Sequence, residues 1–552
     1  MTFTTRPELR GTFGAVASTH WLATQAAMAV LERGGNAFDA ACAAGFVLQV
    51  VEPHLNGPGG DLPAVFWSAE AGKPLVLCAQ GVAPAGATID EYRARGLERV
   101  PGTGLLAACV PGSFGGWLLL LEQFGTWPLA DVLDYAIGYA EHGYPVIPGI
   151  TMTIERVEPL LREWPASAEL YLPAPRPGST FRNQQLAATW RRLLAESGGT
   201  VEGARRVYYE GFVADEIDQF SQSNGGVLTG DDMARWRATL ESPMTFDYRG
   251  LTVCKTEAWG QGPSALQQLA LLEGYDVSSL SEPELVHVFT EATKLALADR
   301  DANYGDGADI GELLTPEYAA ERRTLIGDDA SAELRPGRGR LPRLGVESAQ
   351  TPIGAGEPTR GDTVHLDVAD RFGNLISATP SGGWLQSSPT IPALGWPLGS
   401  RAQMFWLEEG LPSSLVPGKR PRTTLSPGLV LRDGEPWLAY GTPGGDQQEQ
   451  WALHAFIRHV DRGLDLQAAI DAPEWHTDHL ISSFDPRGFA PRSLSVESRF
   501  GEDVIDDLRR RGHEVIVTDA WSLGRVSAVK REGGQVVAAS NPRGMQGYAA
   551  CR

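Results

Sequence analysis

The sequence predicts a protein of mixed helices and strands, and three regions support this. In Thr363–Val368, polar and apolar residues alternate with the period of a strand that has one buried face. Asp370–Asn374 supplies turn residues, and Leu375–Thr379 is typical of the returning strand of a hairpin. The segment 40–51 is apolar on nearly every side, as expected of a buried helix, and 282–303 has a strong helical pattern.

Capping and turn signals define the elements before these regions. Asn36 is predicted to cap the helix that contains 40–51, with Asp39 at its third position and Pro53 just after its end. The glycine-rich loop 56–61 lacks the Gly-Lys-Ser/Thr of a P-loop, which argues against phosphate binding. Ser113 is predicted to cap a helix, because Pro111 precludes a Gly-x-Ser-x-Gly nucleophile motif.

Composition and charge exclude several classes of function. The chain has 552 residues, 42% of them hydrophobic, and a formal net charge of −21. That charge argues against nucleic acid or an anionic membrane as a partner. No apolar run approaches the roughly 20 residues that span a bilayer. The first residues lack the apolar core of a signal peptide, so we expect a cytoplasmic protein. The five cysteines are scattered and odd in number, which favours free thiols.

The hairpin also contains a candidate nucleophile. The segment 326–362 is rich in glycine, proline and arginine, a composition that predicts mobility. It leads directly into a strand that opens with Thr363. This order suits a precursor that is cut between Asp362 and Thr363. The new α-amino group, with an unperturbed pKa of roughly 7.7–8.0, is a suitable base for the Thr363 hydroxyl. The alternative is a purely structural threonine, since threonine is common at strand starts.

Motifs along nearly the whole chain resemble those of one family. In the first half they are Gly34-Gly35-Asn36-Ala37-Phe38-Asp39-Ala40, Val51-Glu52-Pro53 and Ala298-Asp299-Arg300. In the second half they are Thr363-Val364-His365, Asp370-Arg371-Phe372-Gly373-Asn374, Lys419-Arg420-Pro421, Gly441-Thr442-Pro443-Gly444-Gly445 and Asn541-Pro542-Arg543. In order and spacing these motifs resemble the gamma-glutamyltranspeptidase family, which belongs to the N-terminal-nucleophile hydrolases.

The resemblance implies a fold and a mechanism. The expected fold is a four-layer αββα sandwich in which residues 1–362 and 363–552 form two subunits of one shared core. Thr363 would cut the chain by attacking its own preceding carbonyl, and would then form an acyl-enzyme with an amide substrate. Ser381 matches a supporting threonine of the family and is expected to orient the Thr363 amine. Gly444 and Gly445 are the expected oxyanion hole, and no cofactor or metal is expected. We interpret the cluster His476–His479 as a structural loop, because its spacing matches no strong zinc signature.

Several positions depart from the glutamyl-binding pattern of the family. Gln80 lies where relatives carry an arginine that binds the substrate carboxylate; a placement shifted by a few residues would bring in Arg93 or Arg95 instead. Gly383 replaces an asparagine. Phe405 and Trp406 fall where relatives have an aspartate that binds the substrate amino group, which predicts an apolar wall.

One feature of the glutamyl pattern is kept. Thr423 and Thr424 retain the paired hydroxyls that hold the substrate carboxylate in the family, so a carboxylate or carbonyl on the substrate remains compatible with the sequence.

The sequence leaves three functional hypotheses. We favour an autoprocessing amidohydrolase or acyltransferase that acts on a non-gamma-glutamyl amide, as cephalosporin acylases and oxamate amidohydrolase do within the family. The alternative is a true gamma-glutamyltransferase or glutathione hydrolase. The third is a non-enzymatic relative that keeps only the scaffold. The expected partners are a small-molecule amide and the protein's own two fragments, paired as a heterodimer or as a dimer of such heterodimers.

Overall fold

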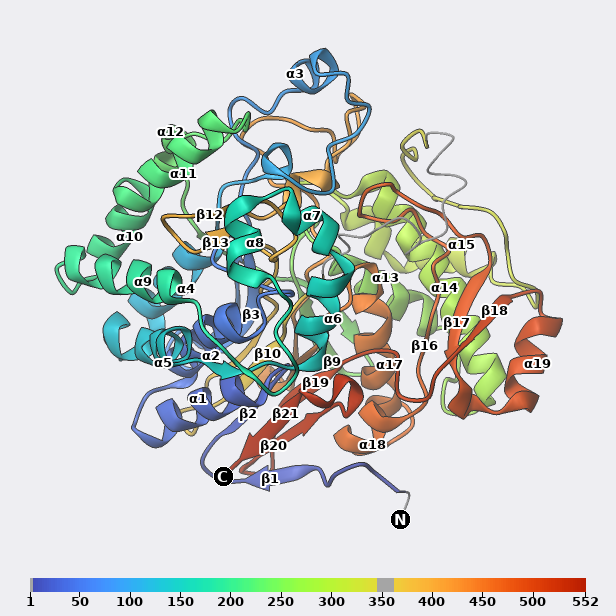
Figure 1. Cartoon of the computed structure of the whole chain (residues 1–552). Helices are drawn as coiled ribbons and strands as arrows, with labels where there is room; N and C mark the ends of the chain where they lie inside the picture. Colours follow the sequence, from blue (N-terminus) through green and yellow to red (C-terminus); the bar gives the residue numbers. More distant parts are fainter. Residues whose placement is uncertain (1–2, 345–361) are drawn as a thin grey trace.

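Two seven-stranded sheets form the centre of the protein (Figure 1). The computed structural model describes residues 3–344 and 362–552. The first sheet has the order β1-β20-β19-β15-β14-β9-β8, and the second has the order β21-β2-β10-β11-β3-β4-β7. The strands of the first sheet are β1 (Leu9–Gly11), β8 (Met244–Tyr248), β9 (Leu251–Lys255), β14 (Gly428–Arg432), β15 (Glu435–Gly441), β19 (Ser527–Glu532) and β20 (Gln535–Ser540). Those of the second are β2 (Ala15–Ser18), β3 (Leu62–Ser68), β4 (Lys73–Ala79), β7 (Thr239–Glu241), β10 (Leu366–Ala369), β11 (Leu375–Ala378) and β21 (Tyr548–Cys551).

The two sheets pack face to face through a layer of mostly small apolar side chains. This buried cluster takes residues from both sheets, including Ala17, Val65 and Ala369 from the second and Ala439 and Val529 from the first. Small residues allow close approach of the two sheets, and their alternation with larger residues is the usual pattern of a sheet sandwich.

Helices cover both outer faces. A large apolar cluster joins the second sheet to α1 (Trp21–Glu32), α2 (Ala37–Val51), α4 (Ser113–Phe124), α5 (Leu129–His142) and α9 (Gln184–Glu196). A separate cluster joins the first sheet to α13 (Pro263–Leu272), α14 (Glu282–Asn303), α17 (Gln448–Val460), α18 (Leu466–Asp471) and α19 (Glu502–Arg510). Figure 1 shows the two helical layers on opposite sides of the sheets, so the predicted four-layer αββα sandwich is confirmed.

The remaining strands and α-helices lie outside the two central sheets, although several of the helices contribute buried residues to the first apolar cluster. The helices are α3 (Ile89–Ala94), α6 (Pro148–Arg156), α7 (Glu158–Arg162), α8 (Pro165–Tyr171), α10 (Val201–Tyr209), α11 (Phe212–Ser223), α12 (Gly230–Arg235) and α15 (Pro316–Arg323). The short strands are β5 (Tyr144–Pro145), β6 (Thr180–Phe181), β12 (Thr390–Ile391), β13 (Trp396–Pro397), β16 (Trp475–His476), β17 (Ser493–Glu497) and β18 (Glu514–Thr518).

The segments before and after Thr363 are interleaved in the sheets. The strand β10 pairs with β2 on one side, and β11 pairs with β3. In the first sheet, β1 pairs with β20 and β9 pairs with β14. Because each sheet takes strands from both segments, neither segment can bury its apolar faces without the other.

The predicted hairpin and buried helix are both present. The side chain of Asp370 closes the hairpin turn by accepting the backbone N–H groups of Phe372 at 2.8 Å and Asn374 at 3.0 Å. Asn36 and Asp39 form a reciprocal capping box at the start of α2, and every residue of that helix is buried. The predicted cap at Ser113 is wrong: α4 begins after Gly112, and the Ser113 hydroxyl accepts from Gln49 instead.

One expectation for the nucleophile strand is also wrong. The alternation in Thr363–Val368 predicts one buried face, but His365 and Asp367 are as fully buried as Val364. The reason is that their polar groups bond to each other and to neighbouring strands: His365 lies 3.0 Å from Asp367, and Ser527 donates to Asp367 at 3.0 Å.

The segment predicted to be mobile, 326–362, falls partly on residues 345–361, which lie outside the described residues. Within its described part, Arg335 forms an ion pair with the buried carboxylate of Glu291 at 3.1 Å.

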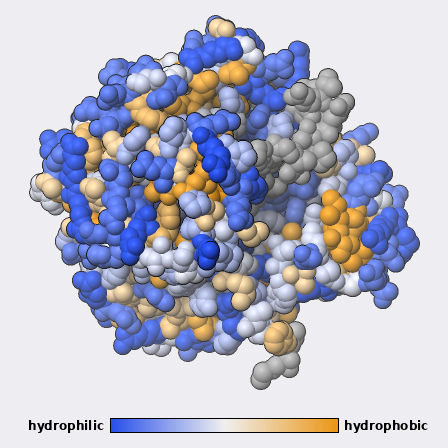
Figure 2. Space-filling view, in the orientation of Figure 1, coloured by the Kyte–Doolittle hydropathy of each residue, from blue (hydrophilic) through white to orange (hydrophobic). Residues whose placement is uncertain are grey.

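The surface is mostly hydrophilic on the face in Figure 2, in keeping with the high net charge. An apolar area on that face lies where Figure 1 places β18, whose Ile516 and Val517 are exposed. Among the described residues, no helix is both long and apolar enough to cross a membrane.

Candidate active site

Thr363 lies at the entrance to β10, where it pairs with Ser381 across an isolated antiparallel bridge. Its side chain is almost fully buried, and its hydroxyl donates a hydrogen bond to the Ser381 hydroxyl at 3.2 Å. Ser381 in turn donates to the carbonyl oxygen of Asp362 at 3.0 Å. A chain of two hydrogen bonds therefore connects the candidate nucleophile to the carbonyl of the predicted scissile bond.

In the uncut chain the Thr363 nitrogen belongs to the peptide bond with Asp362 and is an amide. Its N–H donates to Oδ1 of Asp362 at 2.8 Å. The other carboxylate oxygen of Asp362 forms an ion pair with the guanidinium of Arg525, a residue that sequence reasoning missed. No local pattern marks Arg525, because its partner lies 163 residues away in the chain.

A buried carboxyl group lies near Arg525. Glu52 accepts the Thr19 hydroxyl at 2.6 Å and the side-chain amide of Gln546. Burial raises the pKa of Glu52 to about 7, although the Thr19 hydroxyl and the charge of Arg525 act to lower it. The nearby imidazole of His54 is kept neutral, since burial lowers its pKa to about 3.

The loop 56–61 packs against the residues that follow Ser381. Asp61 pairs with Ser381 and Asn56 with Gly382 through isolated bridges. Gly383 has a φ of +65°, and a Cβ at this position would lie 2.9 Å from the backbone nitrogen of Gly60. Only glycine fits this position, so the asparagine of the family pattern could not be placed here without moving the loop.

Arg401 also binds the loop 56–61, through Asp61. Its Nε donates to Oδ2 of Asp61 at 2.5 Å, with both side chains buried. Sequence reasoning missed this pair, which is separated by 340 residues.

Gly444 and Gly445 follow the end of β15, and two contacts connect this segment to the residues around Thr363. The ring of His365 packs on Gly441, and the Thr442 hydroxyl accepts the backbone N–H of Arg525 at 3.1 Å. The two glycines have φ values of +133° and +58°, which side-chain-bearing residues rarely adopt. Their backbone conformation therefore depends on the absence of a Cβ, as expected for groups whose N–H must approach a ligand closely.

The segment with Thr423 and Thr424 is tied directly to the glycine pair. The side-chain amide of Gln261 donates to the carbonyl oxygens of Thr424 at 2.9 Å and Gly445 at 3.0 Å. The backbone N–H of Thr423 donates to the carbonyl of Trp259 at 2.8 Å. The Thr424 hydroxyl is buried and has no hydrogen-bond partner among the described residues. Both threonines are therefore positioned beside the candidate oxyanion hole.

A buried cluster of ion pairs includes Asp446, the residue that follows the glycine pair. Asp446 accepts from Arg300 at 2.6 Å, and Arg300 also pairs with Asp301 at 2.8 Å. The guanidinium of Arg422 lies 3.6 Å from Asp301, and burial, with Arg300 beside it, lowers its pKa to about 9. Arg300 therefore pairs with Asp301 and Asp446 rather than with its neighbour Asp299, which lies 3.7 Å from Arg322.

Phe405 and Trp406, which the sequence predicts to bind the substrate, do not form one apolar surface. Phe405 packs in an apolar cluster with Tyr92 and Leu415, whereas Trp406 packs in a different cluster with Leu411 and Ile481. The Arg487 guanidinium lies 4.5 Å from the Trp406 ring centre. The two aromatic residues are thus directed into separate parts of the core.

A third apolar cluster lies closer to the glycine pair. It consists of Trp384, Met404 and Phe484, and a Cβ on Gly445 would lie 3.0 Å from the Phe484 ring. Met404 and Phe484 were not predicted from the sequence.

Gln80 is buried next to the Lys-Arg-Pro motif, and its amide lies 3.4 Å from the Pro421 carbonyl. It lines a cavity of about 650 Å³ together with Trp236 and Arg420. Arg93 donates to the carbonyl of Leu407 and Arg95 to that of Gly225, and neither is hydrogen-bonded to Gln80 or to the Lys-Arg-Pro motif in the described residues.

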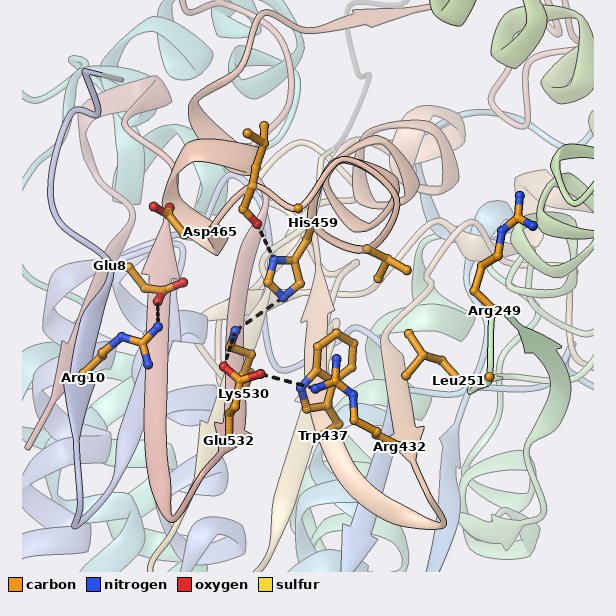
Figure 3. A pocket seen from close by; sticks show the side chains of 14 residues that line it. Glu8, Arg10, Arg249, Leu251, Arg432, Trp437, His459, Asp465, Lys530 and Glu532 are labelled. Atoms are coloured by element: carbon orange, nitrogen blue, oxygen red, sulfur yellow. Dashed lines mark hydrogen bonds and ion pairs between the residues drawn. The ribbon is translucent and has the colours of Figure 1, made fainter. Parts of the chain in front are cut away.

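One cavity lies apart from these residues. It has a volume of about 570 Å³ and is lined by residues of β1, β9, β14, β15 and β19 of the first sheet. Beside it Lys530 approaches His459 and pairs with Glu532 at 3.0 Å (Figure 3). None of its lining residues belongs to the predicted site.

Among the described residues, one group has potential metal ligands close together: His287, Glu291 and His513. The two imidazoles are hydrogen-bonded to each other at 2.9 Å, and Lys294 donates to Glu291 at 2.5 Å. Hydrogen bonds already use both nitrogens of His287 and one oxygen of Glu291, while Nδ1 of His513 has no hydrogen-bond partner among the described residues; we assign no metal to the group.

Comparison with known proteins gives a consistent match along the chain. The family model described as gamma-glutamyltranspeptidase matches residues 23–551. The glutathione hydrolase-like YwrD proenzyme of Bacillus subtilis (strain 168) is 33% identical over 548 residues, covering 97% of this chain and 98% of the relative. The oxamate amidohydrolase proenzyme of Klebsiella pneumoniae is 33% identical over 553 residues, covering 96% and 97%.

Solved structures agree with this match. The structure of LmbA2991HD is 53% identical, with a TM-score of 0.95 and complete coverage of both chains. The cephalosporin acylase of Bacillus halodurans is 31% identical, with a TM-score of 0.88 and coverage of 100% of this chain and 97% of the other.

Proposed function

The chain belongs to the gamma-glutamyltranspeptidase family, and we propose that it is a proenzyme that cuts itself at Asp362–Thr363 and then cleaves an amide through Thr363. The hydrogen-bonded chain from Thr363 through Ser381 to the Asp362 carbonyl oxygen is the observation that carries this proposal. Its relatives are named hydrolases and proenzymes, and an enzyme of this kind needs no further cofactor for the steps below.

Self-cleavage needs a route for protons, because the Thr363 nitrogen is an amide before the cut and cannot act as a base. The geometry supports Ser381 as a relay. As Thr363 Oγ1 bonds to the Asp362 carbonyl carbon, its proton passes to Ser381, and Ser381 passes its own proton to the carbonyl oxygen. The tetrahedral intermediate then transfers a proton to the Thr363 nitrogen, the C–N bond breaks, and water hydrolyses the resulting ester.

In the mature enzyme the roles change. The free α-amine of Thr363, with an unperturbed pKa of roughly 7.7–8.0, accepts the proton of its own hydroxyl as the hydroxyl attacks the substrate carbonyl. The backbone N–H groups of Gly444 and Gly445 stabilise the oxyanion, a contribution of about 3 kcal/mol for each donor. Water or an amine acceptor resolves the acyl-enzyme. The two fragments remain together, since both sheets require strands from each.

The acyl group is proposed to be other than gamma-glutamyl. Gln80 offers neutral donors where an arginine fork would bind a glutamyl carboxylate, and Phe405 replaces an aspartate for its amino group. The likeness to oxamate amidohydrolase and to cephalosporin acylase supports an amidohydrolase or acylase activity. Gamma-glutamyl hydrolysis is the second candidate, favoured by the retained hydroxyls of Thr423 and Thr424 and by the YwrD relative.

The test is intact mass and a denaturing gel on freshly purified protein, beside Thr363→Ala. We expect two fragments that break at Asp362–Thr363 in the wild type and one chain in the variant. The fragments are then assayed on oxamate, a cephalosporin amide and gamma-glutamyl-p-nitroanilide. A wild-type chain that stays uncut for days at neutral pH contradicts the proposal.

A further inference from the structure

We infer that Arg525 is the positioning residue for self-cleavage: it binds the side-chain carboxylate of Asp362 and thereby holds the scissile carbonyl against Thr363 and Ser381. This inference rests on the proposed function. In this reaction Asp362, the residue before the scissile bond, is held by an ion pair with Arg525, in the way that an enzyme binds a charged side chain of its substrate.

Each of the three oxygens of Asp362 has a partner. Its Oδ2 pairs with the Arg525 guanidinium, its Oδ1 accepts the Thr363 N–H at 2.8 Å, and its carbonyl oxygen accepts from Ser381 at 3.0 Å. Free rotation about the Asp362 side chain and backbone would otherwise spread the carbonyl over many orientations. The ion pair therefore selects the orientation in which the carbonyl faces the hydroxyl that attacks it.

Arg525 is itself fixed to the segment that forms the candidate oxyanion hole. Its backbone N–H donates to the Thr442 hydroxyl at 3.1 Å, two residues before Gly444. The preceding residue, Gly524, lies against Trp451, and a Cβ on Gly444 would meet the same ring. The guanidinium thus connects Asp362 to the segment whose N–H groups receive the developing negative charge.

The charges around Arg525 change when the chain is cut. The side chains of Arg525 and Asp362 are 21% and 32% exposed, so the pair is only partly screened by water. The charge of Glu52, a second carboxyl group, also acts on Arg525. When hydrolysis releases Asp362, the guanidinium loses this ion pair while the charge of Glu52 still acts on it, and the Thr363 amide that donated to Asp362 Oδ1 becomes a free amine.

The experiment measures the rate of self-cleavage by densitometry and intact mass. The variants are Arg525→Gln, Asp362→Asn, the double variant, Arg525→Lys, and the exchanged pair Arg525→Asp with Asp362→Arg. We expect each neutral variant to cleave roughly tenfold more slowly, as for loss of one charge-assisted hydrogen bond. The double variant should be no slower than either single one, and both Arg525→Lys and the exchanged pair should recover part of the rate.

Controls separate positioning from folding and from the proposed function. Arg509→Gln, which removes an exposed arginine paired with Asp506, should cleave at the wild-type rate. Thermal melts identify variants that fail to fold, and Asp362→Asn tests the same pair from its more exposed side. Wild-type rates in both Arg525→Gln and Asp362→Asn, or additive effects in the double variant, overturn the inference and leave the proposed function intact. Cleavage of Thr363→Ala at the same bond contradicts the proposed function instead.

Discussion

Gly444 lies against the six-membered ring of Trp451: a Cβ added to the glycine would be 2.2 Å from that ring. The contact is far inside van der Waals distance, so the indole occupies the space of a side chain at residue 444. The glycine also has a φ of +133°, outside the regions available to other residues. Trp451, on the first turn of α17, therefore sets the backbone conformation of the candidate oxyanion hole.

Gly444→Ala should lose both stability and activity. The clash with Trp451 and the positive φ together predict a loss of about 2–4 kcal/mol in the free energy of unfolding. Displacement of the N–H groups should lower kcat roughly 100-fold. Gly434→Ala is the matched control, because Gly434 also has a positive φ but no atom within 4 Å of its Cβ position. Denaturant titration and turnover are measured on both. Equal behaviour of the two variants contradicts the role assigned to Trp451.

Ser381→Ala should impair self-cleavage more than folding. It removes the hydroxyl that links Thr363 to the Asp362 carbonyl, so we expect cleavage to slow roughly 100-fold, within the usual range for a lost proton-transfer group. Ser381→Thr should restore most of the rate. Ser377→Ala, which changes a buried hydroxyl on β11 that donates to the Tyr440 carbonyl, is the control and should leave the time course unchanged. Full-rate cleavage in Ser381→Ala excludes the relay.

Thr424→Val should separate stability from substrate binding. The Thr424 hydroxyl is buried without a hydrogen-bond partner among the described residues, so valine should leave the melting temperature unchanged or raise it slightly. If this hydroxyl binds the substrate, KM for the cleaved amide should rise roughly tenfold. Thr424→Ser keeps the hydroxyl and should keep KM. A melting temperature that falls by several degrees with no change in KM shows a structural hydroxyl instead.

Glu52→Gln should change the pH dependence of stability. Burial raises the pKa of Glu52 from 4.5 to about 7, so the folded protein binds a proton that the unfolded chain releases between these values. The folded state therefore loses stability as pH rises from about 4.5 to 7, by up to about 3 kcal/mol for this group. Glutamine does not ionise, so Glu52→Gln should lack this pH-dependent loss of stability.

The measurement is denaturant unfolding of wild type and Glu52→Gln from pH 4 to pH 8. The stability of the variant relative to wild type should be lowest near pH 4, should increase up to about pH 7 and should then stay constant. A difference that does not vary with pH shows that the folded protein and the unfolded chain bind the Glu52 proton equally, so that folding does not raise its pKa.

The sequence alone determined the elements whose signals are local. The hairpin around Asp370, the capping box of Asn36 with Asp39 and the helix α14 all depend on residues a few positions apart, and all are present. The family motifs identified the fold for the same reason, since each is a short segment whose residues act together. Turn chemistry and periodicity are properties of neighbouring residues, so they can be recognised before any tertiary contact is known.

Only the tertiary structure decided which side chains surround Thr363. The alternation before Val368 could not show that both faces of the strand are buried, because the second face is covered by another sheet. Arg525 meets Asp362 across 163 residues, while the adjacent Phe405 and Trp406 enter different clusters. Such contacts arise when the two sheets pack and bring distant segments together, and no local pattern in the chain records which distant residue will be the partner.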